Sequence, residues 1–269
     1  MTDKYCVIGN PIAHSKSPEI HPVYAAQTGQ DLVYERCLAP LDGFEATVQR
    51  LVAEGYRGAN VTLPFKLEAA RVCTRLEERA RAAGAVNTLS FANGEIVGDN
   101  TDGPGLVADI TRNAGVSIQG KRVLLLGAGG AARGALLPLI QQGPREIVIA
   151  NRTVATAEGL AQDFGRYGIP ITASGFADVE GSFDIVINAT AGSIAGDVPP
   201  VAPGVFGPDA LALDMMYGNQ PTVFMEFAAR HGAGVRDGLG MLVEQAAEAF
   251  AIWRGVRPDT STVMKKMRP

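Results

Sequence analysis

Residues 122–133 read RVLLLGAGGAAR, an apolar strand that runs directly into a glycine-rich turn and the start of a helix. Gly127, Gly129 and Ala132 have the spacing of a dinucleotide-binding turn, in which small residues let the backbone approach a pyrophosphate. A helix that begins near Gly130 would direct its free N–H groups at that anion. The stretch therefore predicts a Rossmann-like unit that binds a dinucleotide cofactor, with a plain tight turn as the alternative.

Strand and helix patterns alternate on both sides of this turn. Before it we expect strands over residues 5–9, 32–38 and 58–63, and helices over 18–28, with Ser17 as the N-cap, and over 42–53. Residues 86–91 and 95–98 flank Ala92-Asn93-Gly94, a hairpin signal that predicts an antiparallel edge on the first sheet. From the turn onward we expect strands over 122–126, 145–150, 171–173, 183–188 and 211–215, and a final helix over 239–253.

This alternation is typical of parallel strands joined by crossover helices, so we predict an α/β fold. A chain of 269 residues is long enough for two domains. We expect a mixed-sheet substrate-binding and catalytic domain over 1–101 plus 238–269, and a Rossmann-like domain over 102–237. The C-terminal helices would then return to the first domain.

Composition excludes several classes of function. The net charge of -4 offers no basic field for nucleic acid. The 3 cysteines are far apart and the 3 histidines lack ligand spacing, so we expect neither disulfides nor a metal, and a reducing cytoplasm. No apolar stretch is long enough for a signal peptide or a membrane span. The expected partner is a small molecule, and the expected state is a monomer or a homodimer.

The residues after the strand over 145–150 favour NADP over NAD. An NAD-binding protein commonly carries an acidic residue here for the ribose, but this chain has Asn151-Arg152-Thr153. The planar guanidinium of Arg152 can pair with a 2′-phosphate, and the Thr153 hydroxyl could add a hydrogen bond. A solvated arginine, with Thr153 capping the next helix, is the alternative.

A lysine and a carboxylate lie in two further motifs, NVTLPFK at residues 60–66 and NTDG at residues 100–103. Lys66 follows Pro64 in a first helical turn, where the helix dipole disfavours a cation. A nearby Asp102 carboxylate would hold and orient a lysine that exchanges protons. Taken singly, Lys66 could be a surface lysine and Asp102 a helix N-cap. Together with a hydride carrier, the pair predicts a carbonyl reductase.

Other polar residues stand where a substrate could bind. Ser15 and Ser17 place two hydroxyls at a helix start, where they could hold a carboxylate. Asn60, Thr62 and Asn87 lie at or near strand ends, where open α/β sheets bind their ligands. Each of these side chains could instead satisfy a turn.

In combination these motifs resemble the shikimate dehydrogenase family of bacteria. The resemblance covers nearly the whole chain and rests on GNPIAHSKSP from Gly9, GANVTLPFK from Gly58, GAVNTL from Gly84, GDNTDG from Gly98, GAGGAAR from Gly127, NRT from Asn151, NAT from Asn188 and DGLGMLVEQA from Asp237. It implies an oxidoreductase of chorismate and aromatic amino acid biosynthesis that reversibly reduces 3-dehydroshikimate to shikimate with NADPH. Lys66 and Asp102 would be its proton-transfer pair.

The resemblance also implies a residue set for each ligand. On the substrate side, Ser15, Ser17 and Tyr217 would bind the carboxylate, and Thr62, Asn87 and Gln245 the ring hydroxyls. On the cofactor side it implies Gly127, Ala128, Gly129, Gly130, Ala131, Asn151, Arg152, Thr153, Thr156, Ala189, Thr190, Met215, Gly238, Met241 and Glu78. Thr156 stands where many members carry a second basic residue, which predicts a weaker preference for NADP. Ala191-Gly192-Ser193 also departs from the common pattern.

Two alternative functions stay open at this level. A quinate or aminoshikimate dehydrogenase would share the lysine and the aspartate. A non-catalytic sensor could keep the fold and bind shikimate or NADPH to regulate a partner.

Overall fold

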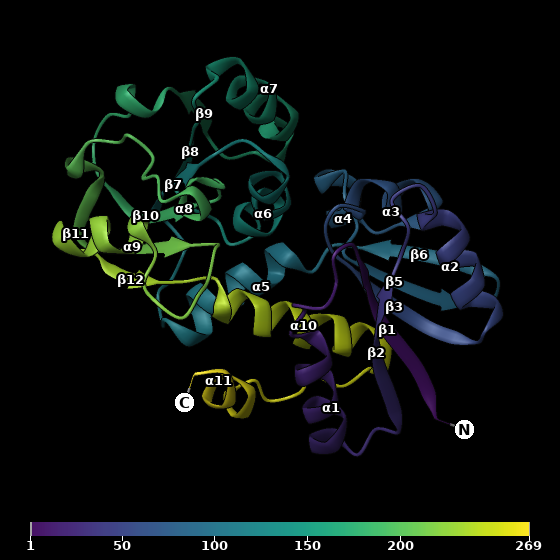
Figure 1. Ribbon diagram of the computed structural model, residues 1–269. Coiled ribbons are helices and arrows are strands. Elements are labelled where there is room, and N and C mark those ends of the chain that lie inside the picture. Colours follow the sequence, from purple (N-terminus) through teal and green to yellow (C-terminus); the bar gives the residue numbers. More distant parts are fainter. Residues whose placement is uncertain (1, 269) are drawn as a thin grey trace. The chain divides into compact units, whose positions relative to one another are not determined.

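The computed structural model describes residues 2–268, apart from the side chains of Ile194 and Ala195. The chain forms two compact units (Figure 1). The first runs to Gly105 and resumes at Val243, and the second is Leu106–Leu242. The boundaries fall inside helices α5 (Asp102–Ala108) and α10 (Leu239–Arg254), a few residues beyond the predicted domain limits.

The first unit is built on a mixed sheet with strand order β2-β1-β3-β5-β6-β4. These strands are β1 (Asp3–Gly9), β2 (Leu32–Leu38), β3 (Tyr56–Val61), β4 (Arg75–Leu76), β5 (Thr88–Ala92) and β6 (Glu95–Asp99). β2, β1 and β3 are parallel, while β5 is antiparallel to both β3 and β6. The β5–β6 turn has positive φ at Asn93 and Gly94, as the hairpin signal predicted.

Helices cover this sheet on both faces, so its strands are apolar on both. Cys6 and Ile8 of β1 pack in a core with residues of α2 (Phe44–Ala53) and α3 (Lys66–Val72), and with Phe65, which directly precedes α3. Tyr5 and Val7 alternate with them and pack with Tyr34 and with Trp253 of α10. α1 (Ser17–Thr28) lies against β1 and β2 (Figure 1). Successive side chains of β1 point to opposite faces of the sheet, so they pack alternately into two different cores.

The second unit is built on a parallel sheet with strand order β12-β11-β10-β7-β8-β9. Its strands are β7 (Arg122–Leu126), β8 (Glu146–Ala150), β9 (Ile171–Ser174), β10 (Phe183–Asn188), β11 (Phe206–Asp214) and β12 (Gly234–Arg236). The glycine turn follows β7. From β7 the chain first adds strands on one side of the sheet, β8 and β9, and then crosses to the other side with β10, so the strand order reverses between β7 and β10. An open parallel sheet binds its ligand at such a point.

The remaining helices follow the expected alternation. They are α4 (Glu78–Ala83), α6 (Gly130–Ile140), α7 (Val154–Phe164), α8 (Gly192–Ala195), α9 (Val223–Arg230) and α11 (Ser261–Met267), and a π-helical turn (Asp109–Asn113) follows α5. α6 lies beside α7, and α9 packs on β11 and β12 (Figure 1). Within residues 2–268 no helix has the length and apolar composition that a membrane crossing needs.

Two local predictions were wrong. Ser17 is not the N-cap of α1, because Lys16 holds that position and no side chain caps the helix. Ser17 is instead buried, and the Ser15 hydroxyl accepts a hydrogen bond from the Ser17 backbone N–H at 3.4 Å. The antiparallel pair is also not the sheet edge, since the two-residue strand β4 pairs in parallel with β6 outside it.

Candidate active site

The structure brings Lys66 and Asp102 together within the first unit. Nζ of Lys66 donates to Oδ2 of Asp102 at 2.5 Å, and the two side chains are 29% and 24% exposed. Lys66 is the first residue of α3, and Asp102 is the first of α5. The backbone N–H of Asp102 is capped by the Asn100 side chain at 3.1 Å, which leaves the Asp102 carboxylate free to face the lysine. The ion pair is only partly buried, so both groups remain reachable from solvent.

Asn87 holds the other carboxylate oxygen of Asp102. Its Nδ2 donates to Oδ1 of Asp102 at 2.8 Å, and the same amide group lies 3.4 Å from Oε1 of Gln245 on α10. The hydroxyl of Thr101 donates to that Gln245 oxygen at 3.3 Å. Asn87 is 3% exposed and Gln245 is 9% exposed, so both are nearly buried beside Asp102. Four of the predicted residues therefore meet in one hydrogen-bonded group.

Asn60 is bonded directly to this group and also to Tyr34, and Ser17 is buried as well. Oη of Tyr34 donates to Oδ1 of Asn60 at 2.7 Å, and Ser17 is 6% exposed. Nδ2 of Asn60 donates to the carbonyl oxygen of Asn87 at 3.2 Å. Both predicted residues are thus nearly buried, and the Asn60 amide is already hydrogen-bonded.

The other predicted substrate residues are less closely tied to this group. Ser15 and Thr62 are both half-buried in the first unit, and the backbone N–H of Thr62 donates to the carbonyl oxygen of Ile8 at 2.9 Å. Tyr217 belongs to the second unit and is 41% exposed after β11. Its predicted role at a carboxylate stays a prediction.

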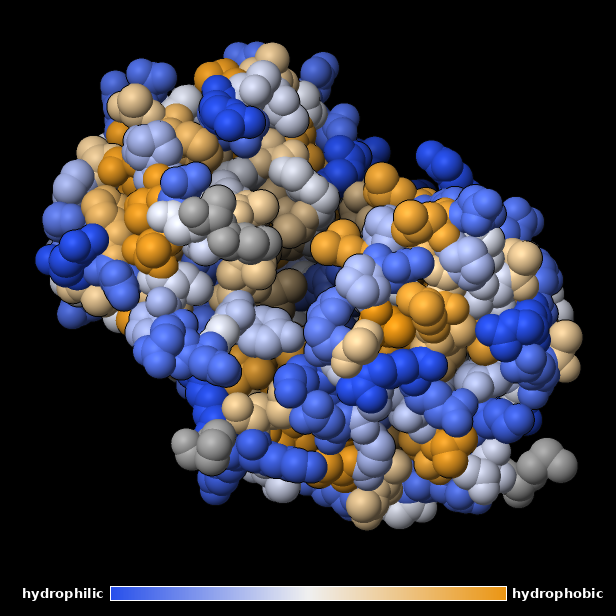
Figure 2. All heavy atoms as spheres, in the orientation of Figure 1, coloured by the Kyte–Doolittle hydropathy of each residue, from blue (hydrophilic) through white to orange (hydrophobic). Residues whose placement is uncertain are grey.

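Apolar side chains border Lys66 along the chain. Leu63 is 73% exposed and Leu67 is 60% exposed, one before α3 and one inside its first turn. Figure 2 shows hydrophobic residues at the surface over the part of the first unit where Figure 1 draws α2 and α3. An apolar border would strengthen the interaction of Lys66 with a bound polar group, because it keeps water away.

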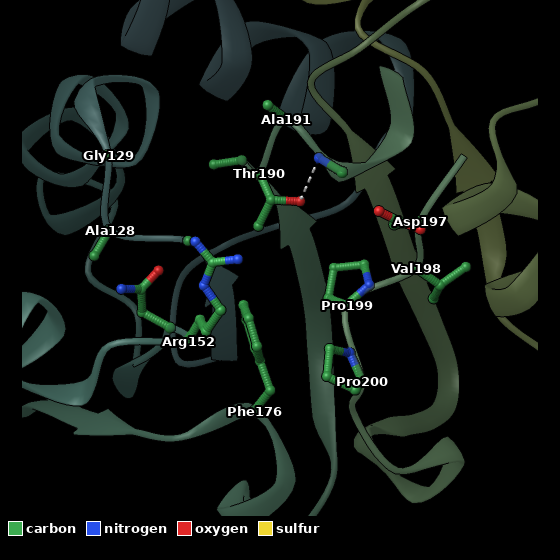
Figure 3. A pocket seen from close by; sticks show the side chains of 14 residues that line it. Ala128, Gly129, Arg152, Phe176, Thr190, Ala191, Asp197, Val198, Pro199 and Pro200 are labelled. Carbon is green, nitrogen blue, oxygen red and sulfur yellow. Dashed lines mark hydrogen bonds between the residues drawn. The ribbon is translucent and has the colours of Figure 1, made fainter. Parts of the chain in front are cut away.

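The second unit holds a cavity of about 570 Å³ at the glycine turn (Figure 3). It is lined by Gly127, Ala128, Gly129, Asn151, Arg152, Phe176, Ala189, Thr190, Ala191, Gly192, Asp197, Val198, Pro199 and Pro200. Seven of these lining residues are predicted cofactor residues, and they come from the carboxyl ends of β7, β8 and β10. The volume suits a small-molecule cofactor site.

The glycine turn has the backbone shape that a pyrophosphate requires. Gly127 has φ of +103°, and a Cβ there would lie 3.2 Å from the carbonyl oxygen of Ala189. A Cβ on Gly129 or Gly130 would meet nothing within 4 Å, so these residues face open space at the first turn of α6. The exposed N–H groups of an eleven-residue helix can hold an anion there. The turn therefore fits a dinucleotide phosphate.

Arg152 extends from the end of β8 into this cavity (Figure 3). It is exposed, and within residues 2–268 no carboxylate forms an ion pair with it. Thr153 is the N-cap residue of α7, but its side chain makes no capping bond. Thr153 and Thr156 are both exposed. The guanidinium and these hydroxyls are therefore available to a phosphate.

The loop after β10 is held by a short polar network. Nδ2 of Asn188 donates to the Ser193 hydroxyl at 3.2 Å, which in turn donates to Oδ2 of Asp214 at 2.6 Å. Thr190 donates to Oδ1 of Asn188 at 2.7 Å. The network thus holds the segment Ala191-Gly192-Ser193, which leads into α8 and contributes Ala191 and Gly192 to the cavity lining.

The remaining predicted cofactor residues lie outside the cavity lining. Gly238 and Met215 pack closely, since the Gly238 N–H donates to the Met216 carbonyl at 2.9 Å and a Cβ on Gly238 would collide with the Met215 carbonyl. Met241 is half-buried in the first turn of α10. Glu78 is exposed at the start of α4 in the first unit, so its role toward the cofactor stays a prediction.

Sequence reasoning missed several residues of both sites. Thr88 and Thr101 lie inside the quoted motifs GAVNTL and GDNTDG, directly beside Asn87 and Asp102, so adjacency was an available signal. Tyr34 gave no signal beyond that of an ordinary strand tyrosine. Phe176 and the segment 197–200 reach the cavity from loops whose course no local pattern predicts.

Comparisons with known proteins agree along the whole chain. Family models described as "Shikimate dehydrogenase substrate binding domain", "Shikimate / quinate 5-dehydrogenase" and "Shikimate 5'-dehydrogenase C-terminal domain" match residues 7–89, 109–195 and 238–268. A protein of Herminiimonas arsenicoxydans named shikimate dehydrogenase (NADP(+)) is 64% identical over 100% of this chain and 98% of its own.

Two solved structures are similar over nearly their full length. An Ael1 enzyme from Pseudomonas putida is 49% identical, with a TM-score of 0.95 over 98% of each chain. The shikimate 5-dehydrogenase of Thermus thermophilus, in complex with NADP(H) and shikimate, is 30% identical, with a TM-score of 0.86 over 99% of each chain.

Proposed function

This chain belongs to the shikimate dehydrogenase family, and on that basis we propose that it reversibly reduces 3-dehydroshikimate to shikimate, with Lys66 and Asp102 as the proton-transfer pair. It is an NADP-dependent oxidoreductase, as are the curated relatives at this identity. The observation that carries the proposal is the 2.5 Å contact from Nζ of Lys66 to Oδ2 of Asp102, with Asn87 on the other oxygen.

The first unit would bind the substrate, and the second would bind NADP. We assign the ring hydroxyls to Thr62, Asn87 and Gln245, and the carboxylate to Ser15, Ser17 and Tyr217. Gln245 and Asn87 support this assignment, because their amides meet beside Asp102. We assign the pyrophosphate to the turn Gly127 to Ala131 and the 2′-phosphate to Arg152 with Thr153 and Thr156.

When bound, NADPH supplies a hydride to the ring carbonyl carbon. Lys66 gives a proton to the oxygen that gains negative charge, and in the reverse direction it accepts that proton. Asp102 holds the Lys66 ammonium in place, and Asn87 keeps the carboxylate from rotating by donating to its second oxygen. General acid–base catalysis of this kind contributes about 10² to 10⁴ in rate, and positioning of the reactants contributes the larger share.

Replacing Lys66 with alanine tests its role. We expect kcat for shikimate oxidation to fall by about 10² to 10⁴, with a much smaller change in KM, because the proton is transferred only in the transition state. The exposed Lys4 of β1 provides the control, and Lys4→Ala should keep the wild-type kcat. A Lys66→Ala protein with near-normal kcat would remove Lys66 from the chemistry.

One steady-state comparison separates the remaining functions. Shikimate and quinate are each assayed with NADP and with NAD on the purified protein. Turnover that is fastest with shikimate and NADP supports the proposal. Faster turnover of quinate would instead identify the protein as a quinate dehydrogenase. Tight shikimate binding without turnover in any combination would favour the sensor.

A further inference from the structure

The amide of Asn87 has a fixed orientation, and this sets the direction of a longer hydrogen-bonded chain. Its Oδ1 accepts from the backbone N–H of Thr101 at 2.8 Å, and a backbone N–H can only donate. Nδ2 of Asn87 must therefore be the group that faces Asp102, at 2.8 Å. The Thr88 hydroxyl lies 2.8 Å from the same Oδ1 and 3.3 Å from the Thr101 hydroxyl, and it donates at the shorter contact because Oδ1 can only accept.

This direction continues from Thr88 to Tyr34. Because Thr88 donates to Asn87, it accepts from Nδ2 of Asn60 at 3.2 Å. Oδ1 of Asn60 is then turned to Tyr34, whose phenol donates to it at 2.7 Å. The chain thus runs from Tyr34 through Asn60, Thr88 and Asn87 to Asp102, with every donor pointing toward the carboxylate.

The members at the far end of this chain are shut off from solvent. Thr88 is 0% exposed and Tyr34 is 7% exposed, so neither presents a surface to a bound substrate. Burial raises the pKa of Tyr34, which keeps the phenol protonated as a donor. The His21 ring stacks on the Tyr34 ring with centroids 4.1 Å apart and planes 6° apart, which fixes where the phenol points.

We propose that Tyr34 and Thr88 are positioning residues for the reaction: they hold the amides of Asn60 and Asn87 so that Asn87 fixes the Asp102 carboxylate toward Lys66. The inference rests on the proposed function of that pair. A buried chain of this kind is stronger than its separate bonds. Losing the Tyr34 phenol removes the donor to Oδ1 of Asn60, and losing the Thr88 hydroxyl leaves Oδ1 of Asn87 with the donors of Thr101 alone. Oδ1 of Asn87 would keep its bond from the Thr101 backbone N–H, but the Asn87 amide would be held less rigidly against Asp102.

Two variants remove one chain member each with little change of shape. Tyr34→Phe deletes the phenol oxygen, and Thr88→Val replaces the hydroxyl by a methyl group. We expect kcat/KM for shikimate to fall about tenfold in each, the scale of one buried hydrogen bond. KM for NADP should stay within about twofold of wild type, since the cofactor residues are untouched. Thr88→Ser restores the hydroxyl and should recover most of the loss.

The double variant tests whether the two residues act as one chain. If they do, kcat/KM of the variant that carries both Tyr34→Phe and Thr88→Val is about as low as that of the worse single variant. It does not fall by the product of the two single losses. Tyr24→Phe is the matched control, because Tyr24 is also fully buried and its phenol donates to the Val243 carbonyl at 3.0 Å, outside the chain. It should lower the melting temperature and keep kcat/KM.

Three results would overturn the proposal: unchanged kcat/KM in both single variants, a double variant whose loss is the product of the singles, or an equal loss in Tyr24→Phe. A second readout needs no turnover. The side-chain amide of Asn87, observed by NMR in the ligand-free protein, should shift and exchange faster in Tyr34→Phe and Thr88→Val but not in Tyr24→Phe. If the wild type fails to oxidise shikimate, the proposed function fails, while unchanged Asn87 signals in the variants would sink the positioning role.

Discussion

Arg152 has an exposed guanidinium, a fixed place at the end of β8 and no acidic partner among residues 2–268. A charged hydrogen bond of this kind is worth about 1.5–3 kcal/mol. We therefore expect Arg152→Ala to raise KM for NADP about tenfold to a hundredfold. KM for NAD should change much less, because NAD lacks the 2′-phosphate. Steady-state kinetics with both cofactors gives the two values.

Arg145 provides the control for this prediction. It is an exposed arginine just before β8, at the opposite end of the strand from Arg152. Arg145→Ala removes the same charge from the second unit and should leave both KM values near wild type. Equal increases for NADP and NAD in Arg152→Ala would contradict the 2′-phosphate contact.

The packing of α10 on the first sheet depends on the absence of a side chain at one position of β3. A Cβ on Gly58 would lie 2.5 Å from the carbonyl oxygen of Leu89 and 2.6 Å from Nε1 of Trp253, which itself donates to that carbonyl at 3.0 Å. We expect Gly58→Ala to destabilise the protein by about 1–3 kcal/mol, because backbone atoms must move to admit the methyl group. Calorimetric melting measures the loss.

A glycine with free space around it should behave in the opposite way. Gly159 lies inside α7, and a Cβ there would meet nothing within 4 Å. Gly159→Ala should therefore stabilise its helix by about 0.5–1 kcal/mol through lower backbone entropy in the unfolded chain. A Gly58→Ala protein that melts as high as Gly159→Ala would show that α10 has room to shift.

The pH dependence of global stability should carry a contribution from His21. Burial lowers the pKa of His21 to about 3, with a smaller opposing effect from Asn60. An unfolded histidine titrates near pH 6.5, so between about 6.5 and 3 the unfolded chain binds a proton that the folded protein does not. The stability from the neutral ring is fully present above about pH 6.5 and is lost as the pH falls through this window, by up to about 1.4 kcal/mol per pH unit.

His21→Phe isolates this contribution, since phenylalanine keeps a flat ring against Tyr34 and binds no proton. The free energy of unfolding, measured with urea between neutral pH and pH 4, should fall less steeply in the variant than in the wild type. Parallel curves for the two proteins would exclude His21 as a source of acid sensitivity.

Local sequence patterns were enough to establish the fold class and the cofactor turn. Alternating strand and helix periods predict an α/β fold, and the positive φ of Gly127 is a requirement of the turn itself. Edge strands β4 and β12 were not predicted, since 2 or 3 residues are too few for a period to show. The motifs also identified Lys66 and Asp102 as candidates, but not the distance between them.

Which polar groups meet depends on the folding of the whole chain. Lys66 and Asp102 are 36 residues apart, and Tyr34 reaches Asn60 across 26 residues. Such contacts depend on strand order and register, and a shift of one residue would turn each strand side chain to the other face. That is why a strand tyrosine without any motif stands at the end of the chain that leads to Asp102, while Asn60, chosen for its strand-end position, has its amide committed inside the protein.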